Sequence, residues 1–179
     1  SYPEEGNSLL FDIEPHSFWF RHRNKCIVAG VRRFAGEAGT VIDVGGGNGF
    51  VALGLQEAGF DITLLEPGRM GAENAVKRGV TNVINATFED AQFAPDTLPS
   101  IILCDVVEHI EDDAGFLKTM YGAQQPGSHV FITVPAFMSL WTKEDELAGH
   151  FRRYTISALR SVLEEAGYNP GDVVAQHFS

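Results

Sequence analysis

The stretch VIDVGGGNGF, residues 41–50, determines how the rest of the chain is interpreted. It is an apolar run with a single acid, Asp43, and glycine fills four of the five positions at 45–49. The apolar run predicts a buried strand, and the glycines predict a tight turn at which a ligand can approach the backbone closely. We expect this turn to lead directly into a helix, with Asn48 as its N-cap. A strand does not need the carboxylate, so the acid requires a separate explanation.

Apolar segments and amphipathic segments alternate along the whole chain. Strands are predicted at 40–44, 61–66, 82–85, 100–105, 129–135 and 172–178, and helices at 17–34, 48–58, 69–78, 112–124 and 155–168, with Gly167 as a C-cap. This alternation is typical of an α/β fold, in which a doubly wound, mostly parallel sheet carries helices on both faces. A length of 179 residues suits one such domain, so we expect a single domain over 1–179.

The composition argues against several classes of partner. The formal net charge is −11, which disfavours a nucleic-acid backbone as the main partner. The two cysteines, Cys26 and Cys104, have the spacing of neither a metal site nor a disulfide framework. No apolar run is long enough for a transmembrane helix, and the N-terminal residues lack the basic region of a signal peptide. We therefore expect a cytoplasmic protein without a transmembrane segment and without a nucleic-acid partner.

The position of Asp43 distinguishes between two kinds of ligand. Ligands of doubly wound sheets bind beyond the carboxyl ends of the strands, where Asp43 and the glycine turn are expected to lie. Gly47, Gly49 and Ala52 also fit the G-x-G-x-x-G/A pattern of dinucleotide sites. A pyrophosphate is anionic, however, and a neighbouring carboxylate would repel it. The acid therefore favours a small ligand with positive charge or ammonium donors.

The ordered set of segments resembles the class I S-adenosylmethionine-dependent methyltransferases. VIDVGGGNG resembles the first motif of that family, and the sulfonium and ammonium groups of the cofactor account for the acid. LLEPG, ATFEDAQF, CDVVEHIED and PGSHVFITVP resemble later motifs in the same order. The fourth-strand and C-terminal segments are similar to the subgroup that includes quinone-biosynthesis and uncharacterised bacterial small-molecule methyltransferases. The resemblance covers about residues 17–176.

The resemblance implies a binding site for S-adenosylmethionine, which becomes S-adenosylhomocysteine after transfer. In the family, the acid that ends the second strand, here Glu66, accepts hydrogen bonds from the ribose hydroxyls, and the loop at 87–89 receives adenine. The family often has Asp where this chain has Thr87, so we expect that contact from the Thr87 hydroxyl or from the backbone that follows it. The residues implied in cofactor binding are Trp19, Arg23, Asp43, Gly45, Gly47, Asn48, Gly49, Phe50, Glu66, Pro67, Thr87, Phe88, Glu89, Cys104, Asp105 and Val106.

The same resemblance divides the domain into four parts. They are a cofactor-covering helix at 17–36, a cofactor-binding core at 40–135, an acceptor-side loop at 136–154, and a final helix and strand at 155–179. The family normally ends with a seventh strand, antiparallel to the others, whereas we count six strand segments here. We therefore expect that the last strand is missing from the chain or is formed by a segment that we assign otherwise.

Asp105, Glu108 and His109 follow the fourth predicted strand and raise the question of a metal. If this segment is helical, positions i, i+3 and i+4 share one face, and two carboxylates with an imidazole suit a divalent ion or a proton relay. The matching positions carry metal ligands in the quinone-biosynthesis O-methyltransferases that the segment resembles. The alternative is that Asp105 contacts the methionine part of the cofactor. We expect no metal, because a sulfonium leaves without a Lewis acid, and these three residues are the candidate ligands if one binds.

The acceptor side is predicted over 136–154. Its candidates are Phe137 and Trp141 for the wall of an apolar pocket, His150 and Tyr154 for orienting the acceptor, and Arg152 or Arg153 for binding an acidic group. His109 and His150 are the candidate catalytic residues, as a base or as groups that position the acceptor.

The predicted function is methyl transfer from S-adenosylmethionine to a small-molecule or lipid-like acceptor by in-line displacement. Three alternatives remain open: a protein or peptide methyltransferase, a cofactor-binding protein without transferase activity, and an NAD-dependent oxidoreductase. Asp43 disfavours the oxidoreductase. The sequence does not predict the oligomeric state.

Overall fold

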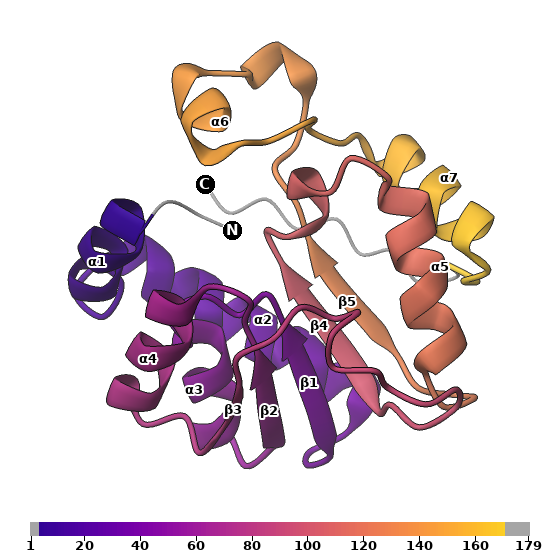
Figure 1. Cartoon of the computed structure of the whole chain (residues 1–179), viewed down its shortest axis with the longest axis horizontal. Helices are drawn as coiled ribbons and strands as arrows, with labels where there is room; N and C mark the ends of the chain where they lie inside the picture. Colours follow the sequence, from indigo (N-terminus) through magenta and orange to yellow (C-terminus); the bar gives the residue numbers. More distant parts are fainter. Residues whose placement is uncertain (1–3, 171–179) are drawn as a thin grey trace.

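The computed structural model describes residues 4–170, which form a parallel β-sheet covered by helices (Figure 1). The sheet has five strands in the order β3-β2-β1-β4-β5, and neighbouring strands are parallel. The strands are β1 Thr40–Val44, β2 Asp61–Leu65, β3 Asn82–Ile84, β4 Ser100–Cys104 and β5 Val130–Thr133. The order reverses between β1 and β4, and ligands of such sheets bind at this switch point, beyond the carboxyl ends of the strands.

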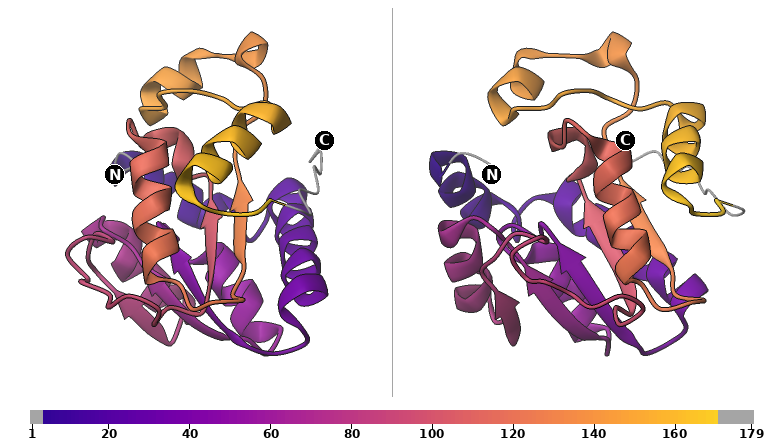
Figure 2. Two further views of the ribbon diagram at one scale, coloured as in Figure 1. Left: turned by 90° about the vertical axis from the view of Figure 1, so that its right-hand side faces the viewer. Right: turned by 45° about the vertical axis from the view of Figure 1, so that its right-hand side comes forward.

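Helices cover both faces of the sheet, as the two further views in Figure 2 show. One face carries α2 Phe18–Ala35, α3 Phe50–Glu57 and α4 Arg69–Arg78, and α1 Glu4–Ile13 packs against α4. The other face carries α5 Asp113–Ala123 and α7 Ile156–Ala166, which pack against each other. The doubly wound α/β fold predicted from the sequence is confirmed.

The central strand is buried on both faces, which explains its continuous apolar run. Val41 belongs to the core cluster under α2 and α3, whereas Ile42 and Val44 belong to the cluster under α5 and α7. Burying each such side chain contributes roughly 1.5–3 kcal/mol. Asp43 lies in the same strand and is also fully buried. The apolar core that stabilises the strand therefore makes the ionised form of Asp43 energetically unfavourable.

The predicted helices all occur, with ends shifted by a few residues, whereas α1 was not predicted. Gly167 is the C-cap of α7 and has a φ of 104°, as its sequence position suggested. Five of the predicted strands are found in the sheet. The sixth, at 172–178, lies outside the described residues.

The start of α3 differs from the prediction. The helix begins at Phe50, and the residue that precedes it, Gly49, has a left-handed backbone and acts as the N-cap. The Asn48 side chain is buried, and its Oδ1 accepts a hydrogen bond from Nδ2 of Asn74 at 3.0 Å. Asn48 as the N-cap was therefore wrong, because this side chain joins the glycine turn to α4 instead of capping α3.

Residues 136–154, which we call the acceptor-side segment, lie above the carboxyl ends of the strands in Figure 1. The sequence predicted a loop, but the segment contains the single turn η2 Met138–Leu140 and the helix α6 Lys143–Ala148. Its two ends are held together, because Ala136 and Tyr154 form an isolated parallel bridge. In the part of the chain that the structure describes, no helix is both long enough and apolar enough to cross a membrane.

Candidate functional site

The carboxylate of Asp43 lies at the centre of the candidate site. It is fully buried, and within residues 4–170 neither of its oxygens has a hydrogen-bond partner. The pKa of Asp43 is raised to about 7, chiefly by burial and also by the charge of Glu66, while the charge of Arg23 opposes the rise. A buried carboxylate without a partner is unfavourable. Its environment therefore suits a ligand that brings positive charge or N–H donors.

The glycine turn passes directly over this carboxylate. A Cβ at Gly46 would lie 2.7 Å from Oδ2 of Asp43, and a Cβ at Gly45 would lie 2.8 Å from Cγ2 of Val106. A Cβ at Gly47 would meet nothing within 4 Å, although its φ of 52° favours glycine. The turn thus combines close packing on its inner side with open space beside Gly47, where a ligand can approach the backbone.

Glu66 follows the last residue of β2 and connects two turns. It is 7% exposed, and its carboxylate accepts hydrogen bonds from the N–H of Gly47 at 2.9 Å and from the N–H of Gly68 at 2.7 Å. Burial raises the pKa of Glu66, and the two backbone N–H groups partly offset that rise. Glu66 is therefore not a solvated strand end but a buried acceptor beside the glycine turn.

A cavity of about 570 Å³ opens beside the glycine turn. It is lined by Val44, Gly45, Leu65, Pro67, Ala86, Thr87, Phe88, Glu89, Val106, Ile110, Asp112, Gly115, Phe116 and Thr119. The structure thus brings the predicted adenine loop at 87–89 together with Pro67 and the glycine turn. Sequence reasoning missed the residues from the region around the start of α5, because only the tertiary fold brings them to the cavity.

The two adenine-loop side chains have partners of their own. The hydroxyl of Thr87 donates to Oδ2 of Asp90 at 2.7 Å and accepts from the Asp90 N–H at 3.0 Å. The ring of Phe88 is buried in the core against Phe93 and Phe116. The backbone of this loop is therefore better placed for a ligand than the Thr87 hydroxyl.

Arg23 reaches from α2 to the ends of two strands. Its Nη2 lies 2.6 Å from Oδ2 of Asp105 and 2.8 Å from Oγ1 of Thr133. Its guanidinium also lies 5.6 Å from the ring of Trp19, which is 43% exposed. Asp105 has a φ of 55°, an uncommon backbone conformation for a residue other than glycine. Trp19, Arg23 and Asp105, which the resemblance implies in cofactor binding, are thus brought together, and Thr133 is a neighbour that the sequence did not indicate.

Phe50 and Cys104 complete the predicted cofactor set. Phe50 is half-buried at the start of α3, with its ring edge-on to Phe20. Cys104 is a free, half-buried thiol at the end of β4, and burial raises its pKa. A thiol with a raised pKa is a poor nucleophile, so Cys104 fits the role of a small residue beside the site.

The three candidate metal ligands do not come together as the sequence suggested. Residues after Asp105 form only the single turn η1 Val107–His109, and the Asp105 side chain turns to Arg23. Glu108 and His109 are instead grouped with His150, and potential ligand atoms of these three residues lie within 4.8 Å of one another. The expected i, i+3, i+4 face requires a longer helix than the chain forms here.

Glu108 and His109 are buried groups with shifted pKa values. Glu108 is fully buried, and burial, followed by the charge of Asp105, raises its pKa. Burial lowers the pKa of His109, and the neighbouring His150 lowers it further. The rings of the two histidines lie 4.6 Å apart at an angle of 83°. Both predicted catalytic histidines thus occupy one cluster at the carboxyl end of the sheet.

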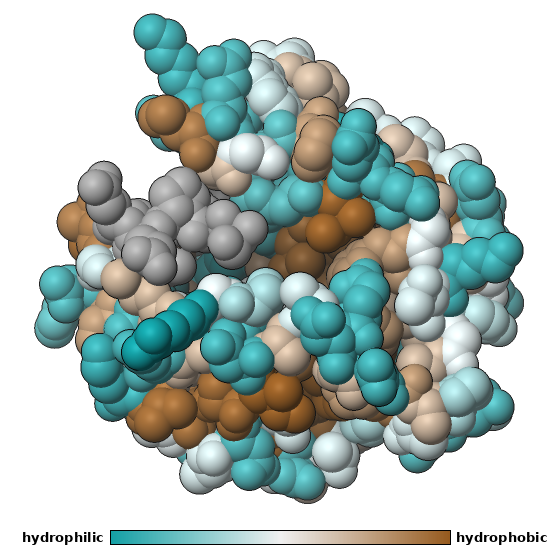
Figure 3. Space-filling model, viewed as in Figure 1, coloured by the Kyte–Doolittle hydropathy of each residue, from teal (hydrophilic) through white to brown (hydrophobic). Residues whose placement is uncertain are grey.

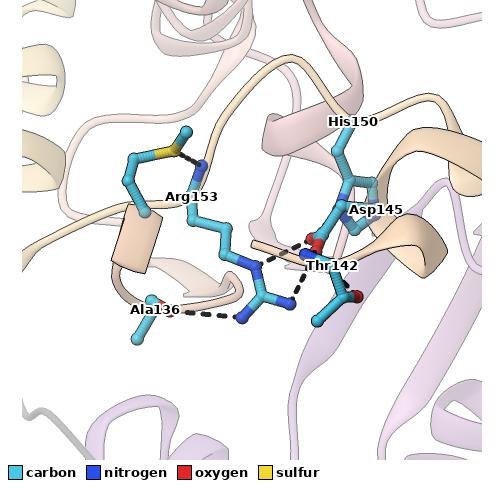
Figure 4. Close-up of polar contacts among 6 residues, drawn as sticks. Ala136, Thr142, Asp145, His150 and Arg153 are labelled. Atoms are coloured by element: carbon cyan, nitrogen blue, oxygen red, sulfur yellow. Dashed lines mark hydrogen bonds and ion pairs between the residues drawn. The ribbon is translucent and has the colours of Figure 1, made fainter. Parts of the chain in front are cut away.

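Asp145 organises the acceptor-side segment (Figure 4). Its carboxylate receives Nε and Nη2 of Arg153 at 2.8 Å each, the Thr142 N–H at 2.8 Å, and Nδ1 of His150 at 2.8 Å. The guanidinium of Arg153 holds the pKa of Asp145 well below its usual range. Sequence reasoning missed Asp145, although a Thr followed by an acid three residues later is a recognisable capping-box signal.

Other polar side chains of the segment are used inside the protein. Arg152 lies 2.6 Å from Oδ2 of Asp113, and the hydroxyl of buried Tyr154 donates to the same oxygen at 2.6 Å. Arg153 is held by Asp145. All three groups thus anchor the segment to itself or to the start of α5, and a contact of any of them with the acceptor stays a prediction.

Apolar side chains are exposed on both sides of the candidate site. On the acceptor-side segment they include Phe137, Met138, Leu140 and Phe151, and on α2 they include Phe18 and Trp19. In Figure 3 the surface is hollowed below the acceptor-side segment, and hydrophobic atoms lie in the hollow. Phe137 and Trp141 are exposed and half-buried, respectively. An apolar ligand can therefore be accommodated on this side.

Comparisons with known proteins show the family of the chain. A family model described as a methyltransferase domain matches residues 19–172. The ubiquinone biosynthesis O-methyltransferase of Rickettsia felis is 29% identical over 99 residues, covering 52% of this chain and 40% of the relative. That of Pectobacterium atrosepticum is 31% identical over 102 residues, covering 52% and 41%. The chain thus spans about 40% of the length of these curated relatives.

A solved structure shows the same fold. A proposed S-adenosylmethionine-dependent methyltransferase from Methanococcus maripaludis superposes with a TM-score of 0.73 at 18% identity, covering 93% of this chain and 85% of the other. The match to the family model extends over most of the chain and includes the glycine turn, Glu66 and the residues of η1. The chain therefore belongs to the methyltransferase-domain family, as a class I domain whose cofactor is S-adenosylmethionine.

Proposed function

We propose that this chain transfers a methyl group from S-adenosylmethionine to a small-molecule or lipid-like acceptor. The observation that carries the proposal is the Asp43 carboxylate, buried under the glycine turn and without a hydrogen-bond partner in the described residues. A ligand with an ammonium or sulfonium group offsets the cost of burying that charge. The bound cofactor supplies a methyl group on a sulfonium, with a neutral thioether as leaving group.

The contribution of the chain itself is alignment of the two reactants. Asp43, Glu66 and the glycine turn lie on core-buried strand ends and can hold one reactant in a fixed orientation. The acceptor-side segment covers the same end of the sheet and can orient the other. Correct alignment of two reactants supplies roughly 7–11 kcal/mol of the barrier reduction. We assign His109 and His150 to the acceptor side of this site.

The exposed apolar side chains favour an acceptor with an apolar part. Phe18 is 75% exposed, and Met138 and Leu140 are more than half exposed. Contiguous apolar surface commonly marks a binding region, and hydrophobic atoms lie in the hollow in Figure 3. The curated relatives are named for ubiquinone biosynthesis, and this supports a small lipid-like acceptor for this chain.

Cofactor binding and acceptor class need separate experiments. Calorimetry should show S-adenosylmethionine binding to the wild-type chain and binding weakened by about 1–3 kcal/mol in Asp43→Asn, the range for losing a charge-assisted hydrogen bond. Incubation with cell extract and cofactor labelled in the methyl group then tests the acceptor. We expect label in the fraction extracted by organic solvent. Label in the protein pellet would identify a protein methyltransferase, and binding without any transfer would identify a cofactor-binding protein.

A further inference from the structure

Three side chains from two separate segments meet where the acceptor-side segment contacts the sheet. Glu108 and His109 belong to η1, His150 follows α6, and their potential ligand atoms all lie within 4.8 Å of one another. The N–H of Phe151 donates to the carbonyl of Glu108 at 2.8 Å, which fixes the two segments against each other. We propose that Glu108, His109 and His150 bind one divalent metal ion of the zinc type.

The state of the Glu108 side chain is an independent observation in favour of a cation. Its side chain is fully buried, and in residues 4–170 neither carboxylate oxygen has a hydrogen-bond partner. Buried carboxylates are normally paired with a cation or bound to a metal. The two arginines of the nearby segment, Arg152 and Arg153, are engaged by Asp113 and Asp145. The charge of Arg23 also acts on Glu108, but that guanidinium is paired with Asp105. An ion between Glu108 and the histidines would give the carboxylate a directly bound cation.

Both histidines are arranged as metal-binding histidines usually are. Nδ1 of His150 lies 2.8 Å from Asp145, whose carboxylate is held ionised by Arg153 and can only accept, so Nδ1 carries the proton. The ring of His109 is hydrogen-bonded to the backbone of Ala148. In each ring one nitrogen is therefore used by the α6 region, and the other keeps its lone pair for an ion.

The ligand set indicates the kind of metal. Two imidazoles and one carboxylate are typical of zinc sites with an open fourth position, whereas magnesium and calcium prefer oxygen ligands. This set is not the one that the sequence resemblance implies, because Asp105 is 2.6 Å from Arg23 and His150 takes its place. If the proposed function holds, an acceptor hydroxyl fits the open position, and the ion would lower the pKa of that hydroxyl.

Zinc binding can be measured without knowing the acceptor. Zinc chloride is titrated by calorimetry into the full chain after chelator treatment, with magnesium chloride as a comparison. We expect one zinc ion per chain and much weaker magnesium binding. Losing a side chain that only orients a metal ligand costs roughly 10–100-fold in metal affinity. Glu108→Gln and His150→Gln each remove a proposed ligand itself, so each should weaken zinc binding by at least about 100-fold. The control is His129→Gln, an exposed histidine at the opposite end of the sheet, which should bind zinc like the wild type.

Thermal stability separates a metal ligand from a structural residue. Glu108→Gln replaces a buried carboxyl group that has no hydrogen-bond partner in residues 4–170, so the metal-free variant should be about as stable as the wild type and still bind zinc poorly. Anomalous scattering at the zinc edge should then place the ion about 2.0–2.2 Å from the ligand atoms. Unchanged zinc affinity in both variants would overturn the proposal. An ion located between His22 and Cys26, whose Nε2 and Sγ atoms lie 3.8 Å apart on α2, would also overturn it.

Discussion

The cofactor side and the acceptor side of the site are built in different ways. On the cofactor side, Asp43 and the glycine turn rest on strands of the buried core. On the acceptor side, Asp145 and Arg153 hold a segment whose surface carries several exposed apolar side chains. The cofactor side therefore depends on packing and the acceptor side on a few polar contacts. Substitutions on the cofactor side should alter ligand binding and the stability of the core. Substitutions on the acceptor side should loosen the acceptor-side segment.

The largest effect is expected where the acceptor-side segment depends on one carboxylate. Asp145→Ala leaves Arg153 without its bidentate partner and removes the acceptor of His150. Breaking a buried ion pair by removing one partner typically costs about 3–5 kcal/mol. Urea unfolding should show this loss, and limited proteolysis should cut within 136–154 first. Cleavage spread evenly over the chain would mean that the segment is not the part that Asp145 holds.

Two glycines with the same backbone angle offer a matched test of packing. Gly49 and Gly149 both have a φ of 75°, but a Cβ at Gly49 would lie 2.8 Å from Cβ of Ala75, whereas one at Gly149 meets nothing within 4 Å. Alanine in this conformation costs roughly 1–2 kcal/mol, and overpacking adds roughly 1–3 kcal/mol. Gly49→Ala should therefore destabilise by about 2–5 kcal/mol and Gly149→Ala by about 1–2 kcal/mol. Equal losses of stability in thermal unfolding would show that the chain is packed no more tightly around Gly49 than around Gly149.

Asp43→Asn should change binding and stability in opposite directions. The variant keeps the shape of the side chain but loses the charge that a cationic ligand needs, so cofactor binding should weaken by about 1–3 kcal/mol. Without ligand, the buried charge is gone, so the variant should be more stable than the wild type at pH 8. Calorimetry and thermal unfolding of the same preparations test both signs. A less stable variant would mean that Asp43 has a structural partner.

The difference in stability between Asp43→Asn and the ligand-free wild type should also depend on pH. The pKa of Asp43 is about 7 in the folded chain, above the ordinary value of 3.8 expected in the unfolded chain. The folded state therefore holds this proton more tightly, and the ligand-free wild type loses stability as pH rises from about 4 to about 7. Asp43→Asn lacks this loss, so the gap between the two proteins should widen through that window and stay constant above it. A constant gap from pH 4 to 8 would contradict the raised pKa.

The smallest effect is expected at Glu66. Glu66→Gln keeps one carbonyl oxygen as an acceptor, so only one of the N–H groups of Gly47 and Gly68 keeps its partner and the other faces the amide NH2. A net hydrogen bond contributes about 1 kcal/mol, so we expect a loss of about that size in stability without ligand and a similar loss in cofactor affinity. Unfolding and binding measurements on Glu66→Asp give a control that keeps the charge but shortens the side chain. No change in either quantity would remove Glu66 from the site.

The cofactor side could be predicted from the sequence because its determinants are local. A strand, an acid and a glycine turn are contiguous in residues 41–50, and parallel strands bring their carboxyl ends to one edge. The prediction of Asn48 as a cap failed at one residue, since Gly49 has the left-handed backbone and Asn48 bonds to Asn74. Such a choice depends on packing between α3 and α4, which the local sequence does not contain.

The acceptor side could not be predicted to the same extent, because its contacts join residues far apart in the chain. Arg152 reaches Asp113, and His150 joins His109, across about 40 residues in each case. The sequence did not indicate that Arg152 and Arg153 pair with the carboxylates of Asp113 and Asp145. A single turn stands where a helix was expected after Asp105, and the Asp105 carboxylate pairs with Arg23.

The bridge between Ala136 and Tyr154 has a consequence for how such a domain can evolve. Both ends of the acceptor-side segment meet at this one point, where the Phe137 N–H donates to the Tyr154 carbonyl at 2.9 Å. Loop-closure entropy grows slowly with length, by about 0.6 kcal/mol for each doubling. We therefore expect insertions or deletions between the two ends to leave the sheet and the glycine turn in place. If the segment binds the acceptor as proposed, selection can exchange it as a unit while the strand ends remain unchanged.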